Sequence, residues 1–227
     1  MKTIGLLGGT SWASTIDYYR DLNERTQAYY GAPHSAPLIL KSIDYAPLVS
    51  RYETDWAEAR RLFADELAGL AALRPDCLVI CCNTLHRALD ELDRSALPDL
   101  PVIHMVDEAA RVARSAGHRN VLLLGTRFTM ENGYYAGRLG TAGLDVVIPD
   151  ADERETIQAF QEQASQGITP PDAAAWFAAL WARYPECEAA VLACTELPGL
   201  IDADTAPLAL LDPLKIQCAA AFEFAIS

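Results

Sequence analysis

The sequence contains no apolar run that approaches the roughly 18 residues expected of a membrane span, and it is poor in basic residues. Lysine and arginine together number 18 against 31 aspartates and glutamates, which gives a formal net charge of −13. This balance argues against nucleic-acid binding, because a nucleic-acid partner requires a basic surface. An anionic small molecule is still permitted, since backbone N–H groups can hold an anion on an acidic protein.

Lysine is especially scarce, and Lys2, Lys41 and Lys215 lie outside any evident cofactor motif. This scarcity argues weakly against pyridoxal phosphate, which requires a Schiff-base lysine. A metal site is also disfavoured, because Cys77 and Cys81 have no Cys or His partners at zinc-like spacing. We therefore expect neither a cofactor nor a metal.

A secretory leader is not expected. Met1-Lys2 precedes an apolar stretch, but Gly5, Gly8 and Gly9 interrupt that stretch and no Ala-x-Ala cleavage site follows it. We therefore predict a cytoplasmic protein whose six cysteines are reduced.

Short apolar, β-branched runs alternate with segments of helical periodicity, which indicates an α/β fold with parallel strands. Among the predicted helices, the clearest lies within 55–73, where Leu62, Phe63, Leu67 and Leu70 would share one stripe. Two others are predicted over 172–183 and 213–225. Strands are predicted over residues 3–7, 38–42, 77–81, 102–105, 120–124, 145–148, 189–193 and 208–211.

The two halves of the chain resemble each other in two places. Each half contains an apolar run that ends in a cysteine followed by small polar residues, with Cys82 in the first half and Cys194 in the second. The segment Ile4–Thr10, an apolar run with the glycine loop that follows it, resembles Leu122–Thr126 at nearly the same offset. A closed eight-stranded barrel would also fit the strand count. The repeat instead favours two similar open, Rossmann-like subdomains, at 1–100 plus 206–227 and at 101–205, with the active site between them.

Cys82 and Cys194 are predicted at the carboxyl ends of parallel strands, where open sheets bind ligands. Each precedes a predicted helix N-terminus, which lowers the pKa of a thiol and can hold a carboxylate. Two thiols in equivalent settings suit the movement of a proton across a carbon from opposite sides. The alternative is that these cysteines are small buried hydrophobes. Packing alone is assigned to Cys77, Cys81, Cys187 and Cys218.

The loop Gly8–Trp12 follows the first strand but fits neither the dinucleotide nor the Walker pattern. Its glycines either let the backbone approach a ligand or form a tight turn in which Ser11 or Ser14 caps the next helix. His86 lies about one helical turn beyond Cys82. It either tunes the thiol or is an ordinary, partly exposed histidine.

Several segments resemble the aspartate/glutamate racemase family of the cofactor-independent type, and the likeness is strongest to broad-specificity amino-acid racemases. The resemblance runs nearly end to end and implies two similar α/β domains. It also implies an amino-acid substrate, a homodimer, and acid–base catalysis by Cys82 and Cys194 without pyridoxal phosphate or metal. The matching segments are Gly8–Thr15, Asn83–His86, Leu124–Met130, Asp152–Arg154 and Cys194–Glu196.

The resemblance implies a mechanism in which one cysteine, as thiolate, removes the α-proton and the other returns a proton to the opposite face. Because both thiols are present, reaction in both directions is expected. Fixed hydrogen-bond donors would stabilise the charge that develops on the α-carboxylate. The expected substrate contacts are Thr10, Ser11, Asn83, Thr84, Thr126, Arg127, Thr195 and Glu196.

Recognition of the substrate side chain follows the family less closely. Aspartate-specific relatives hold the second carboxylate with basic residues that include a lysine in the second half, whereas Glu155–Ala182 contains no Lys, Arg or His. Arg51 is the nearest candidate in the first half, and the alternative is a solvated surface arginine. Glutamate, or several amino acids, is therefore as plausible a substrate as aspartate.

Two further functions stay open at this point. One is another enzyme of the same superfamily, such as a hydantoin racemase, a maleate isomerase or an arylmalonate decarboxylase. The other is a catalytically silent module that binds an amino acid.

Overall fold

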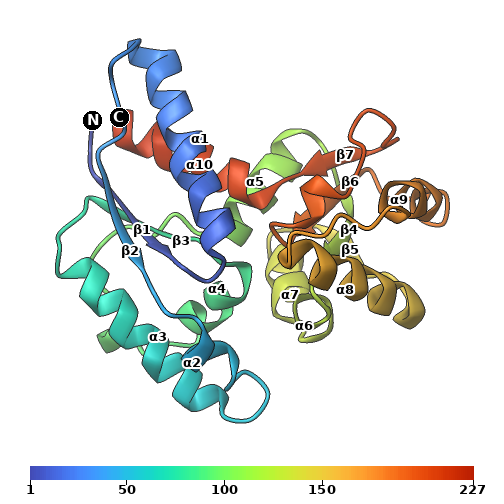
Figure 1. Cartoon of the computed structure of the whole chain (residues 1–227), viewed down its shortest axis with the longest axis horizontal. Coiled ribbons are helices and arrows are strands. Elements are labelled where there is room, and N and C mark those ends of the chain that lie inside the picture. Colours follow the sequence, from blue (N-terminus) through green and yellow to red (C-terminus); the bar gives the residue numbers. More distant parts are fainter. The chain divides into compact units, whose positions relative to one another are not determined.

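The computed structural model describes residues 1–227, which divide into two compact α/β units (Figure 1). The first unit comprises 1–105 and 217–227, and the second comprises 106–216. Each is built on a parallel sheet, so the predicted fold class is confirmed. None of the helices combines the length and apolar character that crossing a membrane requires.

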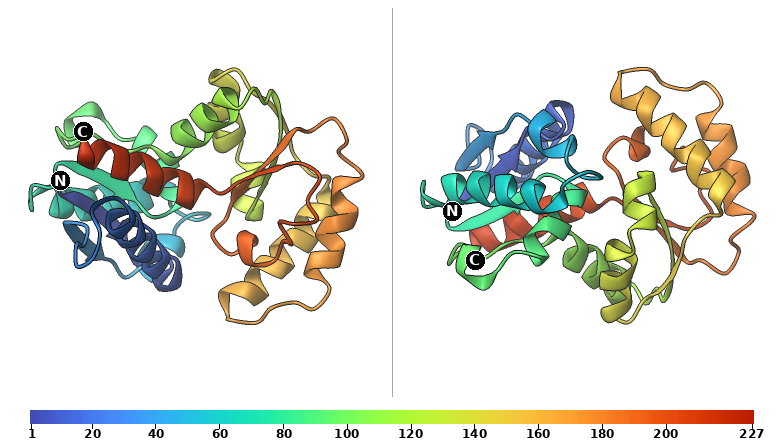
Figure 2. Two further views of the ribbon diagram at one scale, coloured as in Figure 1. Left: turned by 90° about the horizontal axis from the view of Figure 1, so that it is seen from above. Right: turned by 90° about the horizontal axis from the view of Figure 1, so that it is seen from below.

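The first unit contains a three-stranded sheet in the order β2-β1-β3. Leu7 and Ile80 on one face of this sheet pack against Phe63 and Leu67 of a helix, α3. Figure 2 shows α3 in front of the sheet when the unit is seen from below, and α1 and α10 in front when it is seen from above. The elements are β1 (Ile4–Gly8), α1 (Trp12–Tyr30), β2 (Leu38–Ser42), α2 (Ala46–Val49), α3 (Trp56–Ala71), β3 (Cys77–Ile80), α4 (Asn83–Asp90), the 3-10 helix η1 (Arg94–Ala96), and most of α10 (Pro213–Ile226).

The second unit contains a four-stranded sheet in the order β5-β4-β6-β7. Alternate residues of its strands face opposite layers: Leu122 packs with Phe177 of α9, whereas Leu123 packs with Ala110 of α5 and Tyr135 of α7. The elements are α5 (Met105–Ser115), β4 (Asn120–Gly125), α6 (Arg127–Glu131), α7 (Tyr134–Thr141), β5 (Asp145–Val147), α8 (Ala151–Ser165), α9 (Ala173–Trp181), β6 (Ala189–Ala193), the 3-10 helix η2 (Leu197–Gly199), and β7 (Ala209–Leu211).

The helix α3 shows how sequence pattern becomes structure. The carboxylate of Asp55 caps it by accepting from the N–H of Glu58 at 3.0 Å, as an N-cap residue does. Phe63, Leu67 and Leu70 of the predicted stripe are fully buried. The helix ends at Ala71, two residues before the expected end.

Two predictions about chain organisation need correction. The strand expected over 102–105 is reduced to a single parallel bridge between Val102 and Leu78, because Pro101 has no N–H and a helix starts at Met105. Residues 206–216 were expected in the first subdomain, but β7 pairs with β6 through Leu210 and Ala190, so this segment folds with the second unit.

The repeat seen in the sequence corresponds to a shared strand order. In both units the first strand is central, and the cysteine-bearing strand pairs with it: β3 with β1, and β6 with β4. The bridge of Val102 to β3 occupies the position that β7 takes beside β6. The two units therefore place Cys82 and Cys194 at equivalent positions in their own sheets.

Candidate functional site

The carboxyl edge of the first sheet brings together the glycine loop and the Cys82 turn. The N–H of Cys81 donates to the carbonyl of Leu7 at 2.9 Å, which continues the β1–β3 pairing beyond β3. The Thr10 hydroxyl then donates to the Cys81 carbonyl at 3.0 Å. Thr10 therefore lies beside the cysteine turn, as expected from the sequence.

The glycine loop is a tight turn enforced by packing. Gly9 has φ +93°, and a Cβ at this position would collide with the backbone of Ile43. Ser11 caps α1, with its hydroxyl 3.3 Å from the N–H of Ser14, which decides between the two serines considered from the sequence. Gly9 is thus explained by the close passage of the chain after β2, and Gly8 by the close approach of the Thr15 side chain of α1.

Cys82 occupies the N-cap position of α4 and is half-buried. Burial raises the pKa of its thiol, and the donors around the sulfur oppose that rise. These donors are the N–H groups of Leu85 and Thr84 and the hydroxyls of Thr10 and Tyr45. The sequence predicted that the helix N-terminus would lower this pKa; its N–H groups do act in that direction, but burial outweighs them and the pKa of Cys82 is raised on balance.

Two tyrosines complete the surroundings of Cys82. The phenol oxygen of Tyr45 lies 4.0 Å from the Cys82 sulfur and 2.7 Å from the phenol oxygen of Tyr52. Burial raises the pKa of both phenols well above the ordinary tyrosine value, so both keep their protons at neutral pH. Neither residue was predicted from the sequence, because their side chains reach Cys82 only through folding of the segment after β2.

The residue after Cys82 presents a free acceptor. The Asn83 side-chain oxygen is buried and has no hydrogen-bond partner. Buried acceptors in folded proteins are normally paired, so an unpaired one marks a place where a donor can bind. Together with the N–H of Thr84, it gives this edge of the first unit both an acceptor and a donor.

His86 stabilises the Cys82 turn through the backbone carbonyl of Cys82. Its Nε2 accepts from the N–H of Met105 at 3.1 Å, so the ring proton is on Nδ1, which lies 2.8 Å from the Cys82 carbonyl. The ring is fully buried and does not contact the sulfur through these bonds. His86 is thus a positioning residue for the turn and not the partly exposed histidine considered from the sequence.

The His86 ring also belongs to a wider buried network in the first unit. The amide of Gln217 in α10 lies 3.4 Å from Nε2 of His86, donates to the carbonyl of Ile103 at 2.7 Å, and accepts from the Tyr18 hydroxyl at 2.7 Å. The chain leaves this unit after Met105 and returns to it at Gln217. Hydrogen bonds therefore connect the Cys82 turn, through His86, to Met105, where the chain leaves the unit, and to Gln217, where it returns.

Cys194 follows β6 in the second unit and is almost fully buried. Its sulfur donates to Oε2 of Glu196 at 2.9 Å, and the Thr195 hydroxyl donates to the same oxygen at 3.0 Å. The carboxylate of Glu196, whose backbone N–H was the expected contributor, is thus the acceptor at this thiol. The expected α-helix is here only a short 3-10 turn that includes Pro198.

Thr126 and Arg127 follow β4, whose last residue, Gly125, pairs in register with Ala193. This register places Thr126 next to Cys194 at the edge of the sheet. The Thr126 hydroxyl caps α6, and the exposed Arg127 anchors only its N–H, to the Gln158 side chain at 2.8 Å. The structure thus brings both residues to the edge predicted from the sequence.

Arg51 lies in the turn after α2. Its guanidinium donates to the carbonyl of Pro47 at 2.6 Å and to the hydroxyl of Ser50 at 3.3 Å. These bonds hold the turn that carries Tyr52. The structure shows no contact of Arg51 with Cys82, and its assignment to the substrate side chain stays a prediction.

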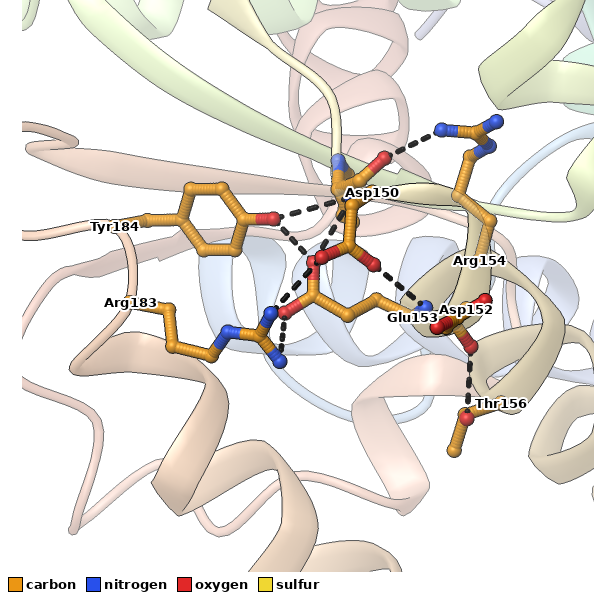
Figure 3. Close-up of polar contacts among 8 residues, drawn as sticks. Asp150, Asp152, Glu153, Arg154, Thr156, Arg183 and Tyr184 are labelled. Carbon is orange, nitrogen blue, oxygen red and sulfur yellow. Dashed lines mark hydrogen bonds and ion pairs between the residues drawn. The ribbon is translucent and has the colours of Figure 1, made fainter.

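The segment Asp152–Arg154 stabilises the start of α8 (Figure 3). Asp150 and Glu153 form a reciprocal capping box, with Glu153 only 3% exposed. Arg183 pairs with both carboxylates, at 2.9 and 2.8 Å, and the Tyr184 hydroxyl donates to Glu153. Arg154 binds the Pro149 carbonyl at 2.6 Å. These contacts stabilise the connection between β5 and α8 and give the segment a structural role.

Burial also sets the protonation state of cysteines that were assigned to packing. All six cysteines are free thiols. Burial raises the pKa of Cys77 to about 12 and that of Cys187 to about 11, so both stay protonated at neutral pH. Burial also raises the pKa of Cys81. No group of three or more His, Cys, Asp or Glu side chains is arranged to hold a metal ion.

Two parallel-sheet α/β units, each with a cysteine after the strand beside its first strand, define the class of this protein. The matching family model is Asp/Glu/Hydantoin racemase, over residues 7–221. The chain therefore belongs to the Asp/Glu/Hydantoin racemase family, and the resemblance noted in the sequence is confirmed.

Individual proteins show the same likeness. A proposed Asp/Glu racemase from Yersinia pestis is 32% identical, with a TM-score of 0.91, and an aspartate racemase homologue from Pyrococcus horikoshii is 27% identical, with a TM-score of 0.88; both structures align over all of both chains. A glutamate racemase from Thermus thermophilus is 32% identical over 168 residues. That alignment covers 69% of this chain and 58% of the relative.

Proposed function

We propose that the protein racemises an α-amino acid, with Cys82 and Cys194 as an acid–base pair and without pyridoxal phosphate or metal. The observation that carries the proposal is the equivalent placement of the two thiols at the carboxyl edges of their sheets. Membership of the racemase family supports it. Aspartate and glutamate are the first substrates to consider, because one relative is described as a glutamate racemase and another as an aspartate racemase homologue.

The groups near Cys82 suit an amino acid in its zwitterionic form. The unpaired oxygen of Asn83 can accept from an ammonium group, and the N–H groups at the start of α4 can donate to a carboxylate. In the proposed reaction Cys82 removes or returns the α-proton on one face, and Cys194 acts on the other. Donors fixed on the carboxylate stabilise the carbanionic transition state.

The proposal is tested with both enantiomers of a panel of amino acids, incubated in D₂O without pyridoxal phosphate. Circular dichroism should show loss of optical activity, and NMR should show α-deuterium in the product. The C82A/C194A double variant is the matched control and should show neither. Absence of exchange from every amino acid would reject the proposal. The panel includes a hydantoin, maleate and an arylmalonate, so that turnover of these compounds identifies a different reaction of the superfamily.

A silent binding module is distinguished by the same experiment. It would bind an amino acid, detected by calorimetry, but would exchange no α-proton. The homodimer expected from the family also stays a prediction, to be checked by analytical ultracentrifugation.

A further inference from the structure

We infer that Tyr45 and Tyr52 form a reversible hydrogen-bond pair that serves Cys82 in both of its protonation states. This inference rests on the proposed function, in which Cys82 alternates between thiol and thiolate. The pair makes Tyr45 a positioning residue for the proton on sulfur.

Cys82, Tyr45 and Tyr52 form a series of polar contacts within the first unit. The oxygen of Tyr45 is 4.0 Å from the Cys82 sulfur and 2.7 Å from the oxygen of Tyr52. The rings meet edge to face at 5.9 Å, and Tyr52 in turn contacts Trp56 at 5.4 Å. The side chains of Cys82, Tyr45, Tyr52 and Trp56 all pack on the hydrophobic cluster that includes Phe63 of α3, and this packing fixes their positions.

A phenol can donate one hydrogen bond and accept others. When Tyr52 donates to Tyr45, the proton of Tyr45 is available to a Cys82 thiolate. When Tyr45 donates to Tyr52, the oxygen of Tyr45 can accept from a Cys82 thiol. Rotation of two O–H bonds is sufficient to change between these arrangements, and no heavy atom has to move.

The other groups at the sulfur lack this ability. The N–H groups of Thr84 and Leu85 can only donate. The Thr10 hydroxyl already donates to the Cys81 carbonyl at 3.0 Å, so turning its proton to the sulfur would break that bond. Tyr45 is therefore the one of these groups that can accept from the thiol and donate to the thiolate while it keeps its hydrogen bond to Tyr52.

The tyrosines do not enter the proton balance of the reaction. The C–H bond of the substrate breaks and an S–H bond forms at Cys82, and the electron pair stays on the substrate. Both phenols keep their protons, since burial raises the pKa of each above its ordinary value. In the reverse step the S–H bond breaks, the C–H bond forms, and the two hydroxyls rotate back.

The test measures alkylation of Cys82 by iodoacetamide as a function of pH, by peptide mass spectrometry. In Tyr45→Phe the midpoint should move to higher pH and the rate at neutral pH should fall about threefold to tenfold, because a donor to the thiolate is lost. Tyr52→Phe should change the rate in the same direction but less. Tyr29→Phe removes a phenol that is 62% exposed on α1 and should leave the profile unchanged.

Cys77 and Cys81 report on folding in the same experiment, because both are buried and should stay unmodified. If Tyr45→Phe exposes them, Tyr52→Phe decides the question. A Cys82 profile in the folded Phe variants that coincides with that of the unaltered protein overturns the inference. The measurement needs no substrate, so it is independent of the proposed function. That function fails separately if the C82A/C194A double variant racemises normally.

Discussion

Cys82 and Cys194 occupy equivalent strand ends, yet their surroundings are chemically opposite. Hydrogen-bond donors surround Cys82, whereas a carboxylate oxygen of Glu196 accepts from Cys194. Donors favour a thiolate, and a carboxylate favours a protonated thiol. The repeated fold has therefore placed its two thiols in different hydrogen-bonding surroundings, with donors at Cys82 and an acceptor at Cys194.

The comparison is tested most severely by removing one thiol at a time. In C82A and in C194A we expect racemisation to fall about a thousandfold, as is typical when a general acid or base is lost. Each variant should still exchange the α-proton of one enantiomer with D₂O, because one base remains. The two variants should exchange opposite enantiomers, which NMR of each pure enantiomer measures. Exchange of the same enantiomer by both variants would show that the thiols do not act on opposite faces.

The Cys82 turn is also supported by hydrogen bonds to a buried side chain. The Cys82 turn is held by the buried His86, which hydrogen-bonds at both ring nitrogens. His86→Leu should lower the free energy of unfolding by about 1–3 kcal/mol, because it leaves the Met105 N–H without its acceptor and removes the side-chain hydrogen bond to the Cys82 carbonyl. Urea unfolding followed by circular dichroism measures the change.

The matched control for this variant is His34→Leu, at an exposed histidine of the loop before β2. It should change stability by less than about 0.5 kcal/mol, as surface substitutions usually do. Equal losses in the two variants would mean that the network around His86 contributes nothing beyond an ordinary surface contact.

The sequence was sufficient to predict what depends on local pattern. The strand ends at Cys82 and Cys194 follow from apolar runs that stop at a cysteine, and the two-unit α/β fold follows from their repetition. Thr10 and Thr126 could be placed near the cysteines because loops after adjacent parallel strands meet at one edge of the sheet.

The sequence was not sufficient where side chains meet across long separations. Gln217 meets Tyr18 and His86 only after α10 has returned to the first unit. Tyr45 reaches Cys82 because the chain turns back after β2, and no periodicity encodes that contact. The short strand β7 was predicted from the sequence, but its pairing with β6 was not. A strand of three residues does not show in its sequence which edge of which sheet it joins.

The smallest of the expected effects concerns Glu196, whose position beside Cys194 permits two opposite roles. If its carboxylate mainly holds the thiol in the protonated form, Glu196→Gln should make Cys194 react with iodoacetamide about threefold to tenfold faster at neutral pH, because a like charge next to the thiolate is removed. If the carboxylate instead withdraws the proton to generate the thiolate, the same variant should react more slowly. The rate is measured at Cys194 and at Cys82 in the same sample.

The control is Glu155→Gln, which removes the same charge from the exposed surface of α8 in the same unit and should leave both rates unchanged. We expect acceleration at Cys194 alone. The Cys194 sulfur and the Thr195 hydroxyl both donate to one oxygen of Glu196, so the side chain is placed as the acceptor of the thiol proton. Replacing it with the neutral amide of glutamine removes the negative charge that would lie beside a Cys194 thiolate. Slower reaction at Cys194 would reverse this assignment and show that the Glu196 carboxylate helps to generate the thiolate.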